Sequence, residues 1–333
     1  MPVILSRREL GQILTMTEVI EAVENGFGEY KKGRCIVPVR MPVRVRKVEG
    51  LFLFMPAYLE KENAFGTKMI SIFPDNPSQG LSTLQAAYML NDPTTGEFLA
   101  LMDGILLTAI RTGATSAVAT KHLSRKDSVV LGIIGTGAQA PFQTEAICAV
   151  RPIRRILAHD KAHERAERFA MSVSESLKIP IEIMGSPGEV VASSDILVTV
   201  TTSSVPVFDS QDLKAGTHIN AVGAYSPEMR ELDEATVKRA RIVVDTYEGC
   251  LAESGDLLIP MRTGQLSEDS IHADLGEIVL GQKPGRMRDD EITLFESVGF
   301  ALEDLVTARL AYQRAKERGI GTEFGLGESS SMG

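Results

Sequence analysis

A glycine-rich turn directly after an apolar run is the segment of this chain most suited to bind a cofactor. Residues 129–140 read VVLGIIGTGAQA, so a strand-like run passes straight into the pattern GxGxxA. In that pattern Gly135 permits a tight turn, Gly137 lets the backbone approach a pyrophosphate, and Ala140 allows close helix–sheet packing. The N-terminus of the following helix would face the phosphates. We therefore predict a dinucleotide site whose turn consists of Gly135, Thr136, Gly137, Ala138 and Gln139.

An acidic residue ends the next apolar run, RILAHD. Asp160 follows Ala140 at the distance where a carboxylate binds the 2′-hydroxyl of the adenosine ribose, which favours NAD. Lys161 comes next and could accommodate a 2′-phosphate, so NADP stays possible. His159 and His163 form an i,i+4 pair, but no third ligand is evident and we expect no metal.

Two charged residues lie in otherwise apolar segments, where a charge is costly unless it is paired or functional. Lys68 occurs in GTKMIS and Arg111 in AIRTGAT. A guanidinium binds a carboxylate through two parallel hydrogen bonds, and an ammonium in a semi-buried groove can donate a proton. We interpret both as candidate catalytic and substrate-binding residues. The alternative that Arg111 pairs with an internal acid or with a cofactor phosphate stays open.

The spacing of apolar residues indicates the elements that must position these side chains. Residues 17–32 show helical spacing, and the runs VPVRMPVRVR, GLFLFMPAY, FGTKMISIF and LSTLQAAYML are typical of strands. Residues 103–123 form a further helical stretch, rich in Ala, Ser and Thr, whose small side chains permit close packing. The first part of the chain thus predicts an antiparallel or mixed sheet.

From residue 128 the pattern changes to short apolar runs, most of them separated by helical segments. VVLGII, RILAHD, IEIM, DILVTVT, HINAVGA and RIVVD are such runs, and this alternation builds a parallel sheet buried on both faces. Ser186, Pro187 and Glu189 predict a capping box at one helix start. A last helix is predicted from about residue 291 to 318, capped by Gly319 and packed on the first domain.

These patterns predict an α/β protein in which a Rossmann-type parallel-sheet domain is inserted into a mixed-sheet α+β domain. The inserted domain would cover residues 121–293, and the mixed-sheet domain for substrate binding and dimerisation would cover residues 1–120 and 294–333. The last residues of the chain, ESSSMG, are predicted to be a frayed tail.

The composition narrows the class of protein further. The 333 residues carry a formal net charge of −9, which argues against a nucleic-acid partner. No signal peptide and no membrane-spanning run of apolar residues is expected. The cysteines Cys35, Cys148 and Cys250 are far apart and lack CxxC spacing, so we expect small core residues rather than a disulfide framework, and a cytoplasmic location.

Several separated motifs together resemble one known family. RTGATSAVATKHL, GTGAQA, INAVGAYSPEMRELD and LFESVGFALEDL occur in the order found in the ornithine cyclodeaminase/mu-crystallin family. The resemblance extends from the opening helix to residue 320. It implies a homodimer whose N-terminal domain supplies the dimer interface and the substrate groove, with NAD(P) bound in the cleft between the domains.

The resemblance also implies roles for individual residues. Arg40, in VPVRMPV, would join Lys68 and Arg111 in binding the substrate carboxylate. The alternative for Arg40 is a solvated strand position, since Arg44 and Arg46 lie close by in the sequence. Tyr225 would contact the substrate. Outside the glycine turn, cofactor contacts are implied for Thr83, Arg111, Thr112, Asp160, Lys161, Thr201, Thr202, Val222 and Ser297.

Tyr225 is also where the chain departs from the cyclodeaminases of the family. Those enzymes carry an aspartate at this point of AVGAYSPEMREL, where it acts as general base on the substrate amine, whereas mu-crystallin and the ketimine reductases lack it. A tyrosine, with an ordinary pKa of about 10, cannot do this near neutral pH. Glu228 could take over as base, although an acid in an early helical turn is its simpler interpretation.

The residues and the resemblance together predict NAD(P)H-dependent reduction of a small α-imino acid to the L-amino acid, with Lys68 protonating the imine nitrogen. A cyclic ketimine such as Δ1-pyrroline-2-carboxylate is the expected substrate. The alternatives left open are an amino-acid dehydrogenase acting on alanine or on a small diacid imine such as iminosuccinate, an ornithine cyclodeaminase, and a non-catalytic NADP-dependent ligand binder.

Overall fold

An eight-stranded mixed sheet organises the first part of the chain. In the computed structural model, which describes residues 1–325, β1 and β7 are parallel and the remaining neighbours are antiparallel. The mixed sheet predicted from the sequence is therefore confirmed. Its strands, in spatial order, are β16 (Thr322–Glu323), β1 (Val3–Leu5), β7 (Phe98–Asp103), β6 (Leu84–Asn91), β5 (Ala64–Ile72), β4 (Gly50–Leu59) and β2 (Cys35–Ile36), with β3 (Met41–Val45) also paired to β4.

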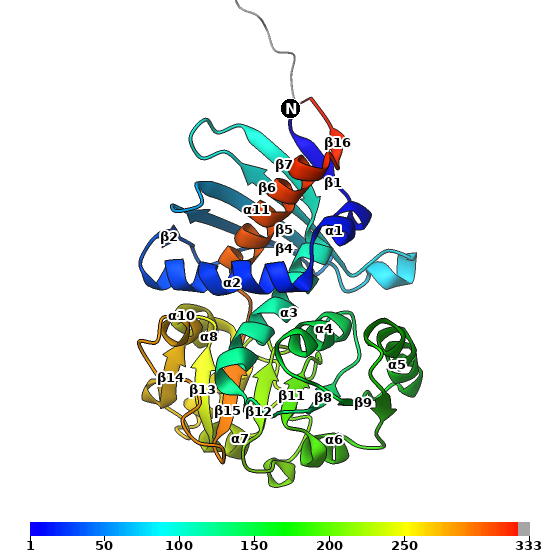
Figure 1. Cartoon of the computed structure of the whole chain (residues 1–333), viewed down its shortest axis with the longest axis vertical. Coiled ribbons are helices and arrows are strands. Elements are labelled where there is room, and N and C mark those ends of the chain that lie inside the picture. The colour runs from blue at the N-terminus through cyan, green and yellow to red at the C-terminus, as the bar shows by residue number, and fades with distance from the viewer. Residues whose placement is uncertain (326–333) are drawn as a thin grey trace, which may run out of the picture. The chain divides into compact units, whose positions relative to one another are not determined.

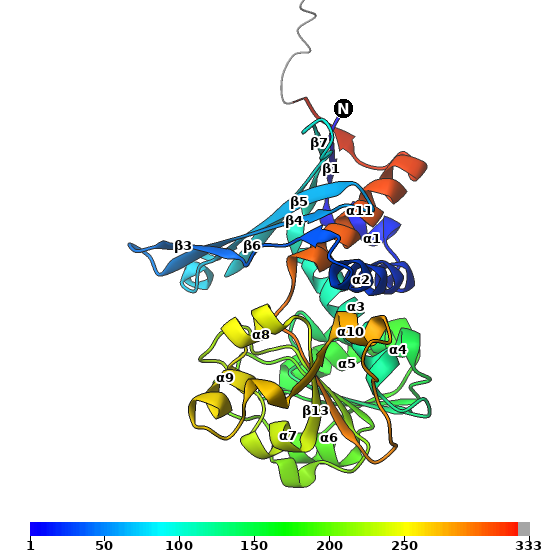
Figure 2. The ribbon, with the colours of Figure 1, turned by 90° about the vertical axis from the view of Figure 1, so that its left-hand side faces the viewer.

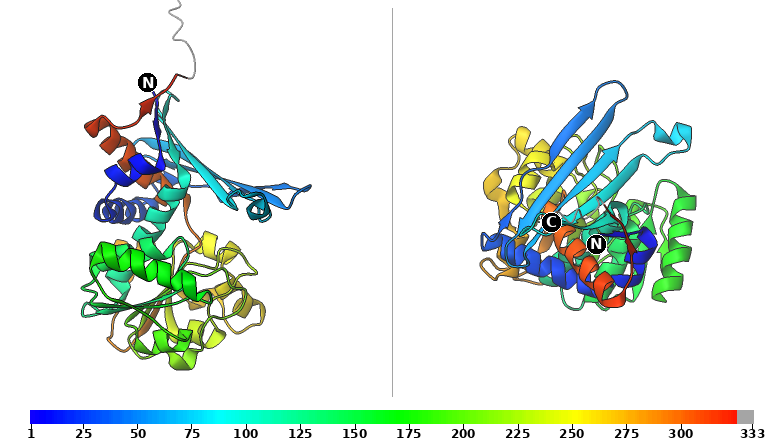
Figure 3. Two further views of the ribbon diagram at one scale, coloured as in Figure 1. Left: turned by 90° about the vertical axis from the view of Figure 1, so that its right-hand side faces the viewer. Right: turned by 90° about the horizontal axis from the view of Figure 1, so that it is seen from above.

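Helix α11 (Ala301–Arg318) packs across β4, β5 and β6 on one face of this sheet, and α1 (Arg7–Ile13) contacts both α11 and β7 (Figures 1 and 2). Because strand residues alternate between faces, Lys68 and Ile70 of β5 are buried on the helix side, whereas Phe65 and Met69 are exposed on the other side. Within this unit no described helix packs on that second face. The β3–β4 hairpin projects beyond the part of the sheet that α11 covers (Figure 3).

Two helices confirm the expectations for the first part of the chain. The predicted helix of residues 17–32 is α2 (Met16–Lys31), and the predicted helix of residues 103–123 is α3 (Gly104–Leu123). The small residues of α3 do permit close packing. A side chain at Gly113 would collide with the backbone carbonyl of Phe142, so only glycine allows the two segments to approach this closely.

An eight-stranded, entirely parallel sheet organises the second part of the chain. The chain passes from β8 outward through β9 to β10, then returns to place β11 on the other side of β8, which makes β8/β11 the topological switch point. In spatial order the strands are β10 (Ile181–Ile183), β9 (Arg155–His159), β8 (Val130–Ile134), β11 (Ile196–Thr199), β12 (His218–Ala221), β15 (Ile292–Glu296), β13 (Ala240–Val244) and β14 (Ile271–Asp274).

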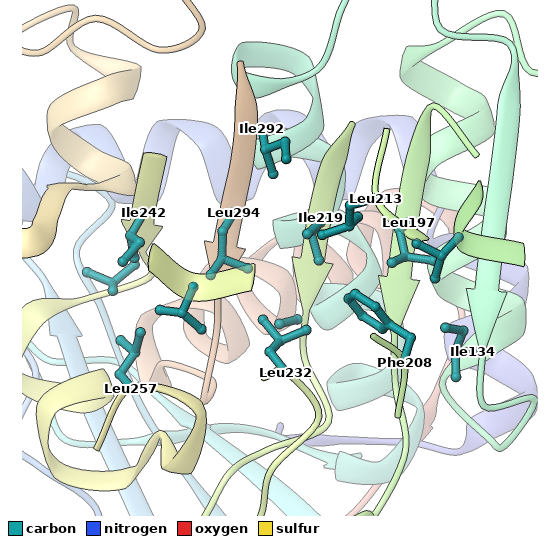
Figure 4. Packing of buried hydrophobic residues seen from close by; sticks show 14 of the residues in the cluster. Ile134, Leu197, Phe208, Leu213, Ile219, Leu232, Ile242, Leu257, Ile292 and Leu294 are labelled. Carbon is teal, nitrogen blue, oxygen red and sulfur yellow. The ribbon is translucent and has the colours of Figure 1, made fainter. Parts of the chain in front are cut away.

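Apolar cores cover both faces of the parallel sheet, which explains its nearly continuous apolar strands. One core packs Leu197, Ile219 and Leu294 against the helices of one face (Figure 4). The other core packs Ile133 and Ile196 against the opposite helices. The helices that contribute to the first core are α6 (Pro187–Ser193), α7 (Glu234–Arg239), α8 (Tyr247–Glu253) and α9 (Gly255–Arg262), and those that contribute to the second are α4 (Ala140–Val150) and α5 (His163–Leu177).

The two sheets belong to two compact units with boundaries that differ from the predicted ones. The predicted divisions after residues 120 and 293 fall inside α3 and inside β15. The predicted frayed tail, residues 328–333, lies outside the described residues. Unit 1 comprises Met1–Ala22, Lys32–Arg111 and the described residues from Ala301 onward, and unit 2 comprises Val23–Lys31 and Thr112–Phe300.

The predicted last helix is wrong at its beginning. Ile292–Glu296 forms a fully buried parallel strand, and α11 begins only at Ala301. A short apolar run such as ITLFE has no periodicity that separates a buried strand from a helix, which explains the error. The end of the helix is as predicted, because Gly319 adopts a positive φ of 62° there.

Two smaller expectations hold only in part. The side chain of Ser186 accepts a hydrogen bond from the backbone of Glu189, but the Glu189 carboxylate accepts from Gly185 N–H instead of completing the capping box. Of the cysteines, Cys250 is buried, whereas Cys35 and Cys148 are half-buried. No helix among the described residues combines the length and apolar character needed to cross a membrane.

Candidate active site

A buried group of charged side chains lies between the mixed sheet and α11 in unit 1. Lys68 projects from the helix-covered face of β5 and is inaccessible to solvent. Its Nζ donates hydrogen bonds to Asp304 Oδ2 of α11 at 2.6 Å and to Thr108 Oγ1 of α3 at 3.1 Å. The ammonium is thereby held in one orientation by groups from two helices.

Arg111 shares the same carboxylate from a different direction. Its Nε donates to Asp304 Oδ1 at 3.0 Å, and its guanidinium also donates to Glu303 Oε2 at 2.5 Å. The side chain is only 6% exposed. Asp304 therefore bridges Lys68 and Arg111, and the two cations are balanced by two carboxylates. Of the two possibilities left open for Arg111, pairing with internal acids is present in the structure.

The electrostatics of this group bear on proton transfer. Burial, together with the positive charge of Arg111, lowers the pKa of Lys68 to about 8, although Asp304 opposes the shift. Burial acts in the same direction on Arg111, but Asp304 and Glu303 outweigh it and raise the pKa of the guanidinium. Near neutral pH Lys68 is therefore a charged acid whose proton is easier to remove than that of an ordinary lysine.

Sequence reasoning missed both acids of this group. Glu303 and Asp304 fall in the first turn of α11, where carboxylates are common because they favour the helix dipole. The available signal was that the two acids interrupt the apolar stretch that includes Leu302, Leu305 and Val306, a part of α11 in which every residue from Ala301 to Ala308 is buried. Two adjacent carboxylates at such positions need buried cations as partners.

Arg40 lies in the same unit, close to Lys68 in register. It is half-buried and directly precedes β3, whose first residue Met41 pairs with Phe54. The next residue of β4 in that direction is Met55, which pairs with Lys68. Arg40 therefore continues the cross-strand row that contains Lys68, two strands away, or roughly 10 Å between backbones.

The predicted dinucleotide turn has the geometry that its glycines suggested. Gly135 follows β8 with a φ of +94°, and a Cβ at this position would lie 2.8 Å from Val200 O. A Cβ on Gly137 would meet nothing within 4 Å, so the space beside its backbone is open. Ala140 is completely buried at the start of α4. Unit 2 thus offers a tight turn, an open approach and a helix N-terminus at the switch point of its sheet.

Asp160 is fixed to this turn by hydrogen bonds. Its Oδ2 accepts from Thr136 N at 2.8 Å and from Thr136 Oγ1 at 3.0 Å, and its Oδ1 accepts from Ala162 N at 2.9 Å. Burial alone would raise the pKa of Asp160, but these hydrogen bonds outweigh it and lower the pKa. An ionised carboxylate has about four acceptor positions, so it can still accept from a ribose hydroxyl.

The remaining predicted contact residues occupy varied positions, and their roles stay predictions. Thr201 and Thr202 follow β11, Val222 follows β12, and Ser297 follows β15, where its hydroxyl donates to Asp245 at 3.0 Å. These four lie at carboxyl ends of parallel strands, where the cofactor of such folds binds. The others are Thr112 in α3, the exposed Lys161 after β9, the exposed Thr83 before β6 in unit 1, and the exposed Tyr225 in the loop after β12.

Glu228 is not in the helical turn that its simpler interpretation assumed. It lies in the non-helical turn after Tyr225, is exposed, and accepts a hydrogen bond from Ser226 Oγ at 3.2 Å.

Unit 2 has the architecture of a dinucleotide-binding domain of the Rossmann type. Unit 1 holds a buried group formed by Lys68, Asp304 and Arg111. These two features together are those of a two-unit, dinucleotide-dependent protein. The chain belongs to the ornithine cyclodeaminase/mu-crystallin family, whose sequence profile matches residues 1–319. The resemblance seen in the sequence motifs is thereby confirmed.

Three relatives illustrate the similarity. A Δ1-pyrroline-2-carboxylate reductase from Bacillus cereus is 40% identical over 96% of this chain and 98% of its own length. The solved structure of Thermococcus litoralis Δ1-pyrroline-2-carboxylate reductase, in complex with NADH and L-proline, is 48% identical, with a TM-score of 0.94 over 97% of this chain and 100% of that one. An archaeal alanine dehydrogenase dimer with bound NAD is 36% identical, with a TM-score of 0.91 over 98% of this chain and 99% of that one.

The shared carboxylate leads to a prediction about stability. Asp304→Asn retains the shape of the side chain but removes the charge that compensates Lys68 and Arg111. Uncompensated buried charge should lower the free energy of unfolding by about 3–5 kcal/mol, measured by urea denaturation. Glu18→Gln is the control, because Glu18 pairs with Arg314 nearer the surface at 2.6 Å and such pairs contribute little. Equal losses of unfolding free energy in Asp304→Asn and Glu18→Gln would contradict the role assigned to Asp304.

Proposed function

We propose that this protein catalyses the NADH-dependent reduction of a small cyclic α-imino acid, such as Δ1-pyrroline-2-carboxylate, to the corresponding L-amino acid. The observation that carries the proposal is the 48% identity, over nearly the whole chain, to a reductase whose structure contains NADH and L-proline. L-proline is the saturated product that such a reduction yields. The buried Lys–Asp–Arg group supplies the chemistry that the reaction needs.

The cofactor would be held by the glycine turn after β8. Backbone amides of the turn and the N-terminus of α4 would bind the pyrophosphate, and Asp160 would bind the adenosine ribose. NADH, when bound, supplies the hydride that is added to the imine carbon. The protein has to bind and orient the imino acid and to provide one proton for the imine nitrogen.

Orientation of the substrate would fall to the cations of unit 1. Arg111 and Arg40 would bind the substrate carboxylate, since a guanidinium can donate two parallel hydrogen bonds to a carboxylate. Arg40 lies in the same cross-strand row as Lys68. The pairs with Asp304 and Glu303 hold the Arg111 side chain in place before substrate binds. A fixed binding group contributes to catalysis because no further order has to be imposed on it in the transition state.

Lys68 would donate the proton to the imine nitrogen, directly or through a water molecule. A general acid acts best when its pKa is near the working pH, and the pKa of about 8 satisfies this. As Lys68 loses its proton, Asp304 remains paired with Arg111. The carboxylate is therefore never left without a compensating cation.

Tyr225 in place of a carboxylate argues against cyclodeamination. The second candidate is an amino-acid dehydrogenase, favoured by the 36% identity to the archaeal alanine dehydrogenase. The two activities share the cofactor and the same reaction at the α-carbon. They differ in whether the imine arrives already cyclic or forms from a keto acid and ammonia.

A panel of substrates at fixed NADH tests the proposal. Cyclic imino acids should give a kcat/KM at least tenfold above that of pyruvate or oxaloacetate with ammonia, followed at the nicotinamide absorbance. L-Ornithine with NAD should release almost no ammonia or proline, because the general base is missing. Higher efficiency with pyruvate and ammonia would identify an amino-acid dehydrogenase instead. NADH binding without any turnover would identify a ligand binder.

The position of Asp160 predicts the choice between the two nicotinamide cofactors. Repulsion between its carboxylate and a 2′-phosphate should cost about 1–3 kcal/mol, so NADH should be used better than NADPH by roughly ten to a hundredfold in kcat/KM. Asp160→Asn removes the charge but keeps an oxygen that can accept a hydrogen bond from Thr136. Asp160→Ser removes both the charge and this hydrogen bond. Both variants should narrow the preference. A tenfold preference of the wild type for NADPH would show that Asp160 does not have this role.

We also propose that the protein is a homodimer formed through the uncovered face of the mixed sheet. On that face Leu101 of β7 pairs in register with Ile4 of β1 and with Met89 of β6. Met69 of β5 pairs with Phe54 of β4. Leu101 and Met69 are 39% and 42% exposed, and a contiguous apolar surface of this kind marks an interface. The archaeal alanine dehydrogenase, a dimer, has the same fold.

Charged substitutions on this face test the dimer. The wild-type chain should sediment with twice its mass of 36.1 kDa, whereas Met69→Glu and Leu101→Glu should shift the equilibrium toward the monomer. Burying an unpaired carboxylate opposes association. Met171→Glu is the control, since Met171 is an isolated exposed residue of α5 in unit 2. A wild-type monomer, or dimers that tolerate both substitutions, would contradict the proposal.

A cytoplasmic location is part of the proposal. Cys35, Cys148 and Cys250 are widely spaced and are not in disulfide bonds, an arrangement typical of a reducing compartment.

A further inference from the structure

Glu231 of unit 2 is a completely buried acid whose two oxygens are both used by backbone amides. Its Oε1 accepts a hydrogen bond from Thr201 N at 2.6 Å, and its Oε2 accepts from Gly223 N at 2.9 Å. Thr201 lies in the loop after β11, and Gly223 lies in the loop after β12. One carboxylate thus joins the loops at the carboxyl ends of two neighbouring parallel strands.

The first of these loops is in contact with the glycine turn. A Cβ on Gly135 would lie 2.8 Å from both Val200 O and Thr201 Cγ2, so the turn and the β11 loop are directly adjacent. Dinucleotides bind across the switch point of such sheets, with the two halves of the cofactor on either side. The glycine turn and Asp160 are on the β8–β9 side, which places the β11 and β12 loops on the side of the nicotinamide half.

The backbone of Glu231 is also fixed by hydrogen bonds. Asp256, at the start of α9, accepts hydrogen bonds from Glu231 N at 2.8 Å and from Leu232 N at 2.7 Å. The backbone around Glu231 also pairs with the β11 loop, since Arg230 N donates to Ser203 O at 2.8 Å. The carboxylate therefore extends from an anchored backbone.

Gly223 shows how tightly this junction is packed. A Cβ at this position would collide with Thr201 O and with the Glu231 carboxylate, so only glycine permits the hydrogen bonds to form. The two loops are thus in close contact at the point where the Glu231 carboxylate joins them.

We infer that Glu231 is a positioning residue for the nicotinamide half of the dinucleotide, because its carboxylate fixes the loops after β11 and β12 relative to each other. The inference rests on the proposed function, which supplies the cofactor. Glu231 touches neither cofactor nor substrate in this role. It would act through the backbone amides of Thr201 and Gly223, and so fix the positions of Thr201 and of Val222, the residue before Gly223.

The test compares two ligands that share the adenosine half. ADP carries the adenosine and two phosphates, whereas NADH adds the nicotinamide and its ribose. Burial and the neighbouring Asp256 raise the pKa of Glu231 to about 7, so calorimetric titrations at pH 8 keep the carboxylate ionised. Glu231→Gln replaces one acceptor oxygen with an NH₂ group that faces a backbone N–H. Its dissociation constant for NADH should rise about tenfold, and that for ADP should change less than twofold.

Two further variants complete the experiment. Gly223→Ala disturbs the same junction without altering Glu231, and it should also weaken the binding of NADH more than the binding of ADP. Glu234→Gln is the matched control, because Glu234 lies three residues away and its carboxylate pairs with the Arg230 side chain at 2.9 Å rather than with the amides of Thr201 and Gly223. It should leave both dissociation constants unchanged.

Each outcome decides between the hypotheses. Unchanged dissociation constants in Glu231→Gln, or equal losses of affinity for NADH and for ADP, would overturn the inference. Failure of both Glu231→Gln and Gly223→Ala to fold would assign Glu231 a structural role and also overturn it. A wild-type protein that binds no NADH would instead overturn the proposed function.

Discussion

The balance of charge around Asp304 is the constraint on which unit 1 depends. Lys68 and Arg111 are buried, and burial without compensation would cost more than the net stability of most domains. Their carboxylate partners lie on α11, and Lys68 and Asp304 are separated by 236 positions in the sequence. The chain must therefore return to the mixed sheet after completing the parallel sheet. The insertion of one unit into the other is thus tied to the group that we propose to be catalytic.

Fixed polar groups recur in both units. In unit 1, Asp304 holds an ammonium and a guanidinium together in a buried setting, where hydrogen bonds to charged groups are strong. In unit 2, Asp160 fixes Thr136 of the glycine turn, and Glu231 joins the next two loops of the same sheet edge. Each of these acids accepts several hydrogen bonds from separate segments and so fixes the positions of groups that we propose to bind or to orient ligands.

This rigidity agrees with a reaction in which the cofactor provides the hydride. The protein then contributes chiefly by holding the reactants in position and by supplying a proton at the right atom. A lysine whose pKa is lowered to about 8 can provide that proton and still be charged at neutral pH. The neighbouring arginine lowers that pKa, and in the proposed reaction it would remain the partner of Asp304 once the proton has left.

Features that depend on short-range patterns could be predicted from the amino-acid sequence. They are the glycine turn with Gly135, Gly137 and Ala140, the alternating strands and helices of the parallel sheet, and the charges of Lys68 and Arg111 in apolar segments. Each could be predicted because turn formation, periodicity and the cost of burying a charge depend on neighbouring residues. The partners of those charges became known only from the folded structure, because they lie on distant segments of the chain. Asp304 and Glu231 each lie in an ordinary local setting, and their importance comes from partners that the fold brings to them from distant segments. The run ITLFE shows the same limit, since a buried strand and a buried helix look alike until the neighbouring strands are known.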